Sequence, residues 1–192
     1  MVTLQEIKTG HKYYTFVEQL LHAAFPENER RDDDMQRWNT DNEEQFHCLL
    51  VLDEENPVGL LTYWNFNTFI YIEHLAIDQT LRNKGYGKEA LHTFFKTQAR
   101  TPIVLEVEHP TDETSRRRIV FYERCGLILW ECDYQQPPYR NCDNWFPMYL
   151  MATPPLSFEE DYTHIRTTIY REVYNQFKEE IKAVSLPQQT GP

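Results

Sequence analysis

Three consecutive strand-length apolar segments, joined by two short turns, restrict the fold of this chain more than any other feature. They cover residues 46–52, 58–64 and 69–77, and strands joined so closely can pair only antiparallel, as a meander. The spacing then becomes helical over 85–98 and 114–125, alternating with strands over 102–107, 127–132 and 145–151, and a Pro-rich loop over 135–139 precedes the last strand. This order predicts an α/β (α+β mixed) fold: a mixed, mostly antiparallel central sheet with helices on both faces.

The ends of the chain add further elements. A strand over 2–7 and helices over 13–24 and 32–38 precede the meander, and Pro154-Pro155 marks a boundary after it. We predict a domain over 1–153, a C-terminal helical extension over 154–186 and a disordered tail over 187–192. The extension is amphipathic and needs a partner surface, which is either its own domain or a second copy in a homodimer. Its apolar residues recur at spacings of four: Ile165, Ile169, Val173, Phe177 and Ile181.

Composition excludes several classes of protein. A chain of 192 residues predicts one domain, and a formal net charge of −11 argues against a nucleic-acid partner, which requires a basic face. The first residues lack a leader pattern and no apolar run is long enough to span a bilayer, so we expect neither secretion nor a membrane partner. The four cysteines form no C-x-x-C pair, so we expect reduced thiols of a cytoplasmic protein and no metal site.

One stretch, residues 75–88, carries the chemistry. A strand ends near Ile77, a short loop follows, and Gly85 and Gly87 open a helix. The N-terminus of a helix presents unpaired N–H groups and a partial positive charge, and glycines allow an anion to approach the backbone. Arg82, Lys84 and Lys88 add cationic charge, so the stretch suits a pyrophosphate.

Other phosphate-binding motifs fit less well. The run from Gly85 to Ala90 matches G-x-G-x-x-A, the dinucleotide fingerprint, but that motif requires its first glycine directly after a strand of a βαβ unit. Here a loop separates the strand from Gly85, and the preceding strands form hairpins. A Walker A loop is absent because no Gly-Lys-Ser/Thr follows. A glycine-tolerant surface loop is the remaining alternative.

Two motifs resemble those of the GNAT acyl-coenzyme A N-acyltransferases, over roughly residues 2–152. Residues 82–87 fit the signature Q/R-x-x-G-x-G/A, and residues 121–127 resemble a Y-E-x-x-G-F element, with Leu127 in place of Phe. The strand ending in residues 75–78 looks like the fourth strand of that family. The resemblance implies a GNAT fold and an acetyl-CoA-dependent N-acetyltransferase that moves an acetyl group to a primary amine by direct attack. The alternative is a catalytically silent acyl-CoA-binding or sensing domain.

The resemblance also implies roles for particular residues. Backbone groups of Leu75, Ala76 and Ile77 would pair with the pantetheine arm of acetyl-CoA, and Tyr122 would protonate the departing thiolate. The pyrophosphate would be held by a run of seven residues: Arg82, Asn83, Lys84, Gly85, Tyr86, Gly87 and Lys88. The acceptor would be a small-molecule amine or a peptide amine.

Two carboxylates are candidates for the general base. A primary amine with a pKa near 10 is mostly protonated at pH 7, and deprotonating it costs about 4 kcal/mol. Glu106 ends a strand where several relatives keep their base, and Glu73 lies within a strand, where a charge needs a wet cleft or a partner. His74 and His109 are either proton relays or structural histidines.

The remaining expectations concern the two ends of the site. Arg116-Arg117-Arg118 either bind the 3′-phosphate of CoA, or another anion, or pair with Asp112, Glu113 or solvent. Ser115 stands near a position where many relatives have Asn. We expect the segment 25–31 and aromatic residues around the last two strands, such as Tyr134, Tyr139 and Trp145, to line the acceptor pocket.

Overall fold

The structure is a computed structural model that describes residues 1–98, 101–140 and 144–175. The strands are β1 (Val2–Glu6), β2 (Phe46–Asp53), β3 (Asn56–Asn65), β4 (Ile70–Ile77), β5 (Ile103–Glu108), β6 (Ile128–Gln136) and β7 (Phe146–Ala152). The α-helices are α1 (Tyr14–Ala24), α2 (Asp33–Asn42), α3 (Tyr86–Thr97), α4 (Glu113–Arg124) and α5 (Phe158–Thr168). Short 3-10 turns cover Glu27–Glu29 and Gln79–Leu81, and a π-helical turn, Ile169–Val173, follows α5.

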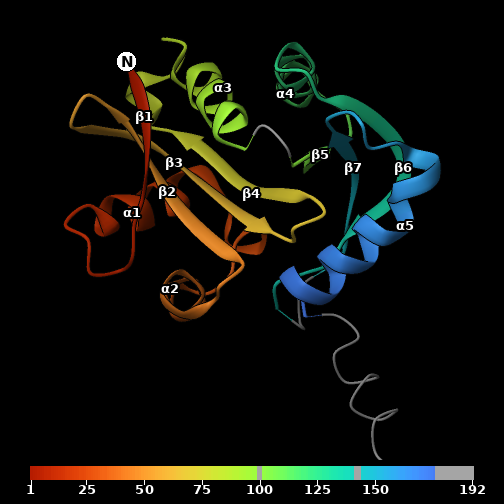
Figure 1. Cartoon of the computed structure of the whole chain (residues 1–192), viewed down its shortest axis with the longest axis horizontal. Coiled ribbons are helices and arrows are strands. Elements are labelled where there is room, and N and C mark those ends of the chain that lie inside the picture. Colours follow the sequence, from red (N-terminus) through yellow and green to blue (C-terminus); the bar gives the residue numbers. More distant parts are fainter. Residues whose placement is uncertain (99–100, 141–143, 176–192) are drawn as a thin grey trace, which may run out of the picture.

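All seven strands form one sheet in the order β1-β2-β3-β4-β5-β7-β6. The predicted meander is present: β2, β3 and β4 pair antiparallel through the two short turns. Among the strands that the structure describes, only β4 and β5 pair in parallel, as the crossover through α3 requires. The mixed, mostly antiparallel sheet predicted from the sequence is thus confirmed (Figure 1).

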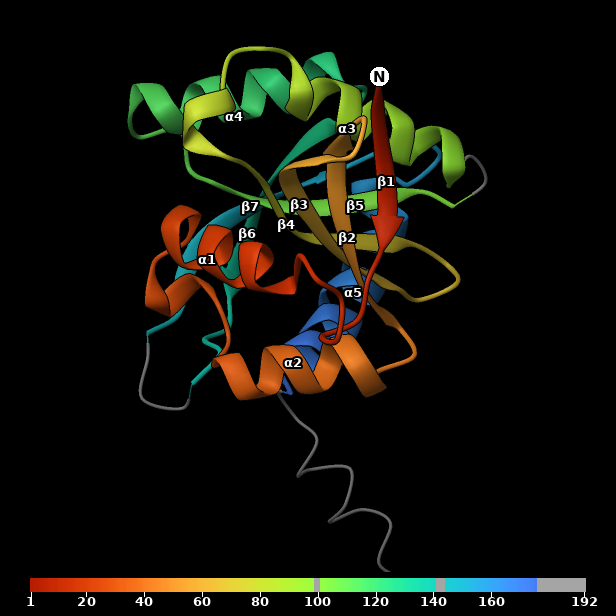
Figure 2. The same ribbon diagram turned by 90° about the vertical axis from the view of Figure 1, so that its left-hand side faces the viewer.

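Helices cover both faces of the sheet (Figure 2). Side chains alternate along each strand, so one face packs against α1 and α5 in a cluster that includes Val17, Leu50 and Ile169. The other face packs against α3 and α4 in a second cluster that includes Leu61 and Phe94. Within the described residues no helix is both long and apolar enough to cross a membrane.

A β-bulge in β4 shapes the centre of the sheet. Thr62 of β3 pairs with His74 and Tyr63 pairs with Ile72, which leaves Glu73 as the extra residue. Beside the bulge the parallel pairing of β4 with β5 ends, at Ile72 and Leu105. Because β4 continues to Ile77 and β5 to Glu108, the two strands diverge beyond this point.

Some predicted boundaries were wrong. Gln135 and Gln136 were expected in the loop before Pro137 but extend β6, because the pairing of β6 with β7 resumes after an irregularity and includes Gln136 with Phe146. Helix α2 continues to Asn42, one turn beyond the predicted end. The C-terminal helix packs back on its own sheet through Ile165 and Ile169. Phe177, Ile181 and Cys142 lie outside the described residues, as does the predicted tail.

Candidate active site

A cavity of about 540 Å³ lies where β4 and β5 diverge. Its walls come from both strands, from the loop after α1, from α4 and from the segments around β7. Seven of the residues proposed for catalysis or cofactor binding line it: Glu73, Leu75, Ala76, Ile77, Arg82, Glu106 and Tyr122. The sheet therefore brings together, in one cavity, residues that lie far apart in the sequence.

The N-terminus of α3 has the form of an anion cradle. Asn83 has a φ of 65° and Gly85 a φ of 90°, so the backbone turns sharply before the helix begins at Tyr86. No side chain caps the helix, and residues 82–85 are exposed. A Cβ on Gly87 would meet the Phe121 ring at 3.6 Å, so the backbone lies close against α4. The uncapped N–H groups and their exposure fit the pyrophosphate of acetyl-CoA.

Close packing also fixes the neighbouring part of β4. A Cβ built on Gly59 of β3 would lie 2.5 Å from the Ala76 carbonyl oxygen, so only glycine lets the two strands approach at this point. Arg82 donates through Nε to the Ile77 carbonyl at 3.3 Å, and Tyr86 donates through its hydroxyl to Asp53 at 2.8 Å. The first contact holds the loop before α3 against the end of β4, and the second ties the start of α3 to the end of β2.

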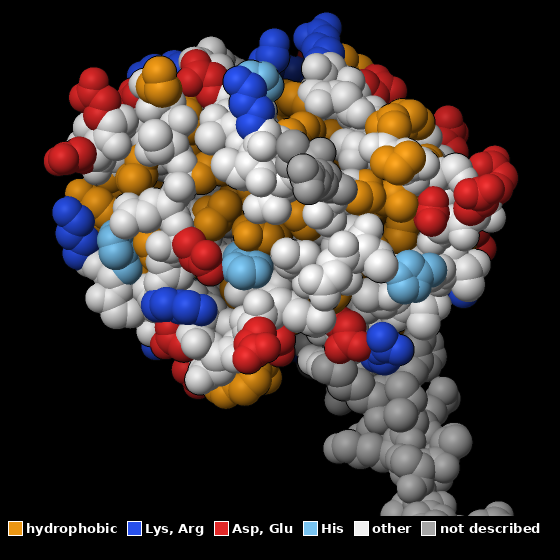
Figure 3. All heavy atoms as spheres, in the orientation of Figure 1, with side chains coloured by type: hydrophobic (Ala, Val, Ile, Leu, Met, Phe, Trp, Pro, Cys, Tyr) orange, Lys and Arg blue, Asp and Glu red, His pale blue; other side chains and the backbone are white. Residues whose placement is uncertain are grey.

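A second cavity, of about 500 Å³, has a basic lining and lies between α3 and α4. It includes Lys88, Arg116, Arg117 and Arg124, and Lys and Arg side chains gather over α4 at the upper edge of the molecule (Figure 3). Arg118 instead pairs with Glu108, a partner that the sequence analysis did not consider.

Ser115 serves the helix rather than a ligand. It is buried and forms a capping box with Asp112, whose side chain accepts the Ser115 N–H at 2.8 Å. The Ser115 hydroxyl lies 3.1 Å from the Asp112 backbone N–H and completes the box.

Glu73 lies in a buried ion pair. Its carboxylate accepts two hydrogen bonds from the Arg31 guanidinium, at 2.8 and 2.5 Å, in the bidentate geometry typical of strong pairs. Tyr139 donates at 2.8 Å and Trp64 at 3.3 Å. The side chains of Glu73 and Arg31 are 0% and 5% exposed. Burial acts to raise the pKa of Glu73, but the charges of Arg31 and His74 and the hydrogen bonds from Arg31 and Tyr139 together hold that pKa below its usual value.

Among the described residues, the hydrogen-bond partners of Glu106 are all neutral. The Tyr134 hydroxyl donates to Oε1, the Gln136 amide donates to Oε2 at 2.5 Å, and the Tyr174 hydroxyl donates to Oε2 at 3.0 Å. Burial raises the pKa of Glu106 above its ordinary value, and these hydrogen bonds offset the rise only in part. A carboxyl group whose pKa is raised toward neutrality is suited to accepting a proton.

Tyr122 lies on α4, on the wall of the same cavity. It is half-buried, and burial raises the pKa of its hydroxyl to about 12. The hydroxyl makes no hydrogen bond to any of the residues that the structure describes, so it is available to a ligand. At neutral pH the phenol is fully protonated and can act as a proton donor.

The two histidines near the cavity, His74 and His109, differ in their hydrogen bonding. His74 is buried, with Nδ1 3.2 Å from the Thr62 hydroxyl and Nε2 3.0 Å from the Glu29 carbonyl oxygen, and burial lowers its pKa. It therefore holds the bulge in place. His109 stacks on Tyr149, and its buried Nε2 has no hydrogen-bond partner among the described residues.

Sequence reasoning missed several residues of the site. Both Arg31 and Tyr134 were expected to line the acceptor pocket. Instead, Arg31 neutralises Glu73, and Tyr134 donates a hydrogen bond to Glu106. Gln136 was assigned to a loop, and Tyr174 was not considered. A buried glutamate within a strand does signal a missing cationic partner, but nothing local to Glu73 identifies that partner as Arg31.

Comparison with known proteins identifies the family. Residues 14–127 match the acetyltransferase (GNAT) family. A GNAT-family acetyltransferase from Bacteroides thetaiotaomicron is 44% identical, with a TM-score of 0.87 over 90% of this chain and 98% of the other. No curated protein matches the chain.

More distant structures share the fold alone. A Bacillus subtilis acetyltransferase in complex with CoA is 16% identical, with a TM-score of 0.55 over 81% of this chain and 100% of the other. Arabidopsis thaliana Naa50, in complex with a CoA–peptide bisubstrate analogue, is 18% identical, with a TM-score of 0.57 over 79% and 97%. With the family match and the 44% identical relative, the chain belongs to the GNAT acetyltransferases, enzymes that use acetyl-CoA as co-substrate.

Proposed function

We propose that this acetyltransferase moves the acetyl group of acetyl-CoA to a primary amine by direct attack within the cavity between β4 and β5. One observation carries the proposal: the cavity runs from Arg82, beside the uncapped N-terminus of α3, to the partly buried Glu106. The first end suits the phosphates of the donor, and the second suits removal of a proton from the acceptor. Backbone groups of Leu75, Ala76 and Ile77, on the diverging part of β4, would pair with the pantetheine arm.

Glu106 is our choice for the general base. Its raised pKa and its neutral partners allow it to take a proton from the acceptor ammonium, directly or through water. Glu73 is a poorer base because Arg31 already compensates its charge. The free amine then forms a bond to the thioester carbonyl carbon, and the carbon–sulfur bond breaks. The hydroxyl of Tyr122 donates its proton to the departing thiolate.

The acceptor end of the cavity favours a cationic amine. Phe25 and Tyr139 provide aromatic walls, and Glu29 and Glu108 add acidic side chains that face the cavity. Burial raises the pKa of Glu29, and Glu108 adds to the rise while Arg118 opposes it. A small-molecule amine or a peptide amine could occupy this end.

We also assign the basic cavity between α3 and α4 to the 3′-phosphate of CoA. Lys88, Arg116, Arg117 and Arg124 line it, and it adjoins the N-terminus of α3 through Lys88. Calorimetry with CoA and with 3′-dephospho-CoA tests the assignment. The Arg117→Ala variant should lower the affinity for CoA severalfold and leave that for dephospho-CoA unchanged. An equal loss for both ligands would contradict the assignment.

Calorimetric titration with acetyl-CoA, with NAD as a control, tests the donor site. We expect micromolar binding of acetyl-CoA and none of NAD. Gly87→Trp should abolish binding, because the space beside Gly87 is already bounded by Phe121 and Ile77 at 3.6 and 3.7 Å. Unchanged affinity in this variant would overturn the pyrophosphate assignment.

A panel of primary amines, assayed by release of the CoA thiol, tests the reaction itself. Thiol release that depends on the amine supports the enzyme proposal. Tight binding of acetyl-CoA without thiol release across small-molecule, polyamine and peptide acceptors would favour a silent acyl-CoA-binding or sensing domain.

Two further proposals concern the cellular location and the oligomeric state of the protein. A cytoplasmic location rests on the cysteines, of which Cys48, Cys125 and Cys132 are free thiols. A homodimer through the C-terminal helix stays a prediction, and size-exclusion chromatography tests it. The stripe formed by Ile165, Ile169 and Val173 packs on its own domain, so a dimer contact would use another face of the helix.

A further inference from the structure

We propose that Tyr174, carried by the C-terminal helical segment, is a positioning residue for Glu106, so that this segment completes the catalytic site of the preceding domain. The inference rests on the proposed role of Glu106 as the general base. Tyr174 lies outside the region that matches the family, which ends at residue 127. The segment after β7 would therefore be part of the catalytic apparatus and more than a cover for the sheet.

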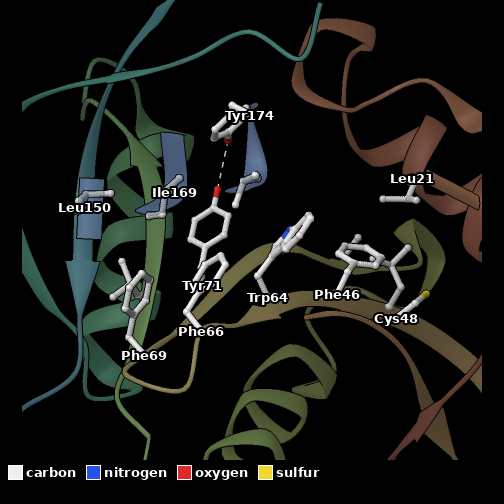
Figure 4. Close-up of a cluster of buried hydrophobic side chains, with 14 of the residues drawn as sticks. Leu21, Phe46, Cys48, Trp64, Phe66, Phe69, Tyr71, Leu150, Ile169 and Tyr174 are labelled. Atoms are coloured by element: carbon white, nitrogen blue, oxygen red, sulfur yellow. Dashed lines mark hydrogen bonds between the residues drawn. The ribbon is translucent and has the colours of Figure 1, made fainter. Parts of the chain in front are cut away.

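The contacts of the Tyr174 hydroxyl carry the proposal. It lies 3.0 Å from Oε2 of Glu106 and 3.3 Å from the hydroxyl of Tyr71, the contact drawn in Figure 4. The Gln136 amide donates to the same hydroxyl at 2.8 Å and to Glu106 at 2.5 Å. Because an amide N–H only donates, the Tyr174 oxygen accepts from Gln136, and the Tyr174 hydroxyl itself donates to the carboxylate.

The proton arrangement is consistent through the whole cluster. Tyr71 can donate to the Tyr174 oxygen, Tyr174 donates to Oε2 of Glu106, and Tyr134 donates to Oε1. The carboxylate is thus held at both oxygens by neutral donors, which fixes its orientation without neutralising its charge. When Glu106 takes up a proton, rotation of one of these hydroxyls lets it accept instead of donate.

The local backbone explains why Tyr174 reaches this position. Ile165, Ile169 and Val173 anchor the segment in the core. After Thr168 the helix widens into the π-helical turn, and Tyr174 ends it with its N–H 3.4 Å from the Ile169 carbonyl oxygen. Such turns change the direction in which the following side chains leave the helix, and they are frequent at functional sites. As a result the Tyr174 side chain is 4% exposed and faces the sheet.

A purely structural role for Tyr174 is the competing explanation. Its ring packs against Tyr139, with centroids 4.9 Å apart, and Tyr139 donates to Glu73. The test must therefore measure the protonation of Glu106 as well as the activity of the enzyme. The titratable and charged groups around Glu106 come from five parts of the chain: Tyr71 and Glu73 of β4, Tyr134 of β6, Tyr139 after β6, Arg31 before α2, and Tyr170 and Tyr174 of the C-terminal segment.

The experiment compares the pH profile of kcat/KM in Tyr174→Phe with that in Tyr162→Phe. A hydrogen bond to the carboxylate favours its charged form, so its loss should move the acidic limb of the profile to higher pH. We also expect kcat/KM at neutral pH to fall roughly tenfold. Tyr162 is the matched control, because it lies on α5 and its hydroxyl donates to the Asp133 carbonyl at 2.7 Å, away from Glu106. Tyr162→Phe should leave the profile unchanged.

Further variants separate the possible failures. If Tyr174→Phe does not fold, Tyr71→Phe should shift the same limb in the same direction, because the Tyr71 hydroxyl contacts that of Tyr174 and itself lowers the pKa of Glu106. An unshifted limb in folded Tyr174→Phe, or equal shifts in Tyr174→Phe and Tyr162→Phe, would overturn the inference. Full activity of Glu106→Gln would instead overturn the proposed base. An inactive Glu106→Gln together with an unshifted Tyr174→Phe would remove only the role of Tyr174.

Discussion

Two glutamates on neighbouring strands have opposite environments. Glu73 of β4 and Glu106 of β5 both line the central cavity, and burial acts to raise the pKa of each, yet the pKa of Glu73 is lowered and that of Glu106 is raised. Glu73 meets the guanidinium of Arg31, while Glu106 meets two tyrosine hydroxyls and an amide. The difference teaches that the charge of the hydrogen-bond partner, and not burial, decides whether a glutamate holds a proton-exchange role or a structural one. A paired charge holds the structure together, whereas a charge with only neutral donors keeps the capacity to exchange a proton.

The largest effect should come from Glu106→Gln. Glutamine keeps the size of the side chain but cannot take up the amine proton, so kcat/KM should fall about 10²–10⁴-fold. The affinity for acetyl-CoA, measured by calorimetry, should stay the same, and thermal unfolding should show a folded protein. Loss of folding in this variant would mean that Glu106 is structural, like Glu73.

Glu73→Gln should act on stability instead. It leaves the buried Arg31 charge without its counter-ion, which typically costs about 3–5 kcal/mol in the free energy of unfolding. Urea unfolding measures the loss. Glu18→Gln is the control, because Glu18 pairs with Arg37, whose side chain is 51% exposed, and it should cost far less. If folded Glu73→Gln lost activity as Glu106→Gln does, the contrast between the two glutamates would fail.

Tyr122→Phe tests the proposed proton donor, which contacts neither glutamate. We expect kcat to fall by roughly ten- to a hundredfold, with little change in the affinity for CoA. The acidic limb of the pH profile should not move, since Tyr122 does not contact Glu106. Unchanged kcat would remove Tyr122 from the mechanism.

The smallest effect, and the most diagnostic of the contrast, is the pH dependence of stability. Glu106 has a raised pKa in the folded state, so its contribution is fully present below its unfolded pKa of about 4.3 and is lost as the pH rises through the folded value. Glu73 has a lowered pKa, so its contribution is present above about pH 4.3 and is lost as the pH falls through the folded value. Each difference of one pKa unit changes stability by about 1.4 kcal/mol.

Urea unfolding across pH can separate the two contributions. Glu106→Gln should remove a loss of stability on the alkaline side, and Glu73→Gln should remove one on the acidic side. Changes of the same sign in both variants would contradict the opposite environments.

The parts of the site that the sequence predicted are local. The cradle at α3 lies within residues 75–88, where strand end, loop, glycines and cations follow one another along the chain. Gly85 adopts a φ of 90°, as a sharp entry into a helix requires. Glu106 and Glu73 were likewise conspicuous, because a carboxylate within an apolar strand needs an explanation.

The parts that the sequence did not predict depend on long-range contacts. Arg31 reaches Glu73 across 42 positions in the chain, and Tyr174 reaches Glu106 across 68. Gln136 was assigned to a loop because two prolines follow it, although pairing with β7 keeps it in β6 and points its amide at Glu106. Local pattern indicates that a residue is unusual, but not which partner will meet it.

The sequence alone therefore determined the order of the elements, the antiparallel meander, the glycine-containing entry into α3 and the family resemblance, because turn chemistry, periodicity and helix-terminal charge act over a few residues. Only the tertiary structure decided which of two glutamates is neutralised and which is surrounded by neutral donors. That choice depends on the divergence of β4 from β5, on the bulge at Glu73 and on the return of the C-terminal segment to the sheet. Charge compensation in a buried site is set by packing in three dimensions, and no local pattern records it.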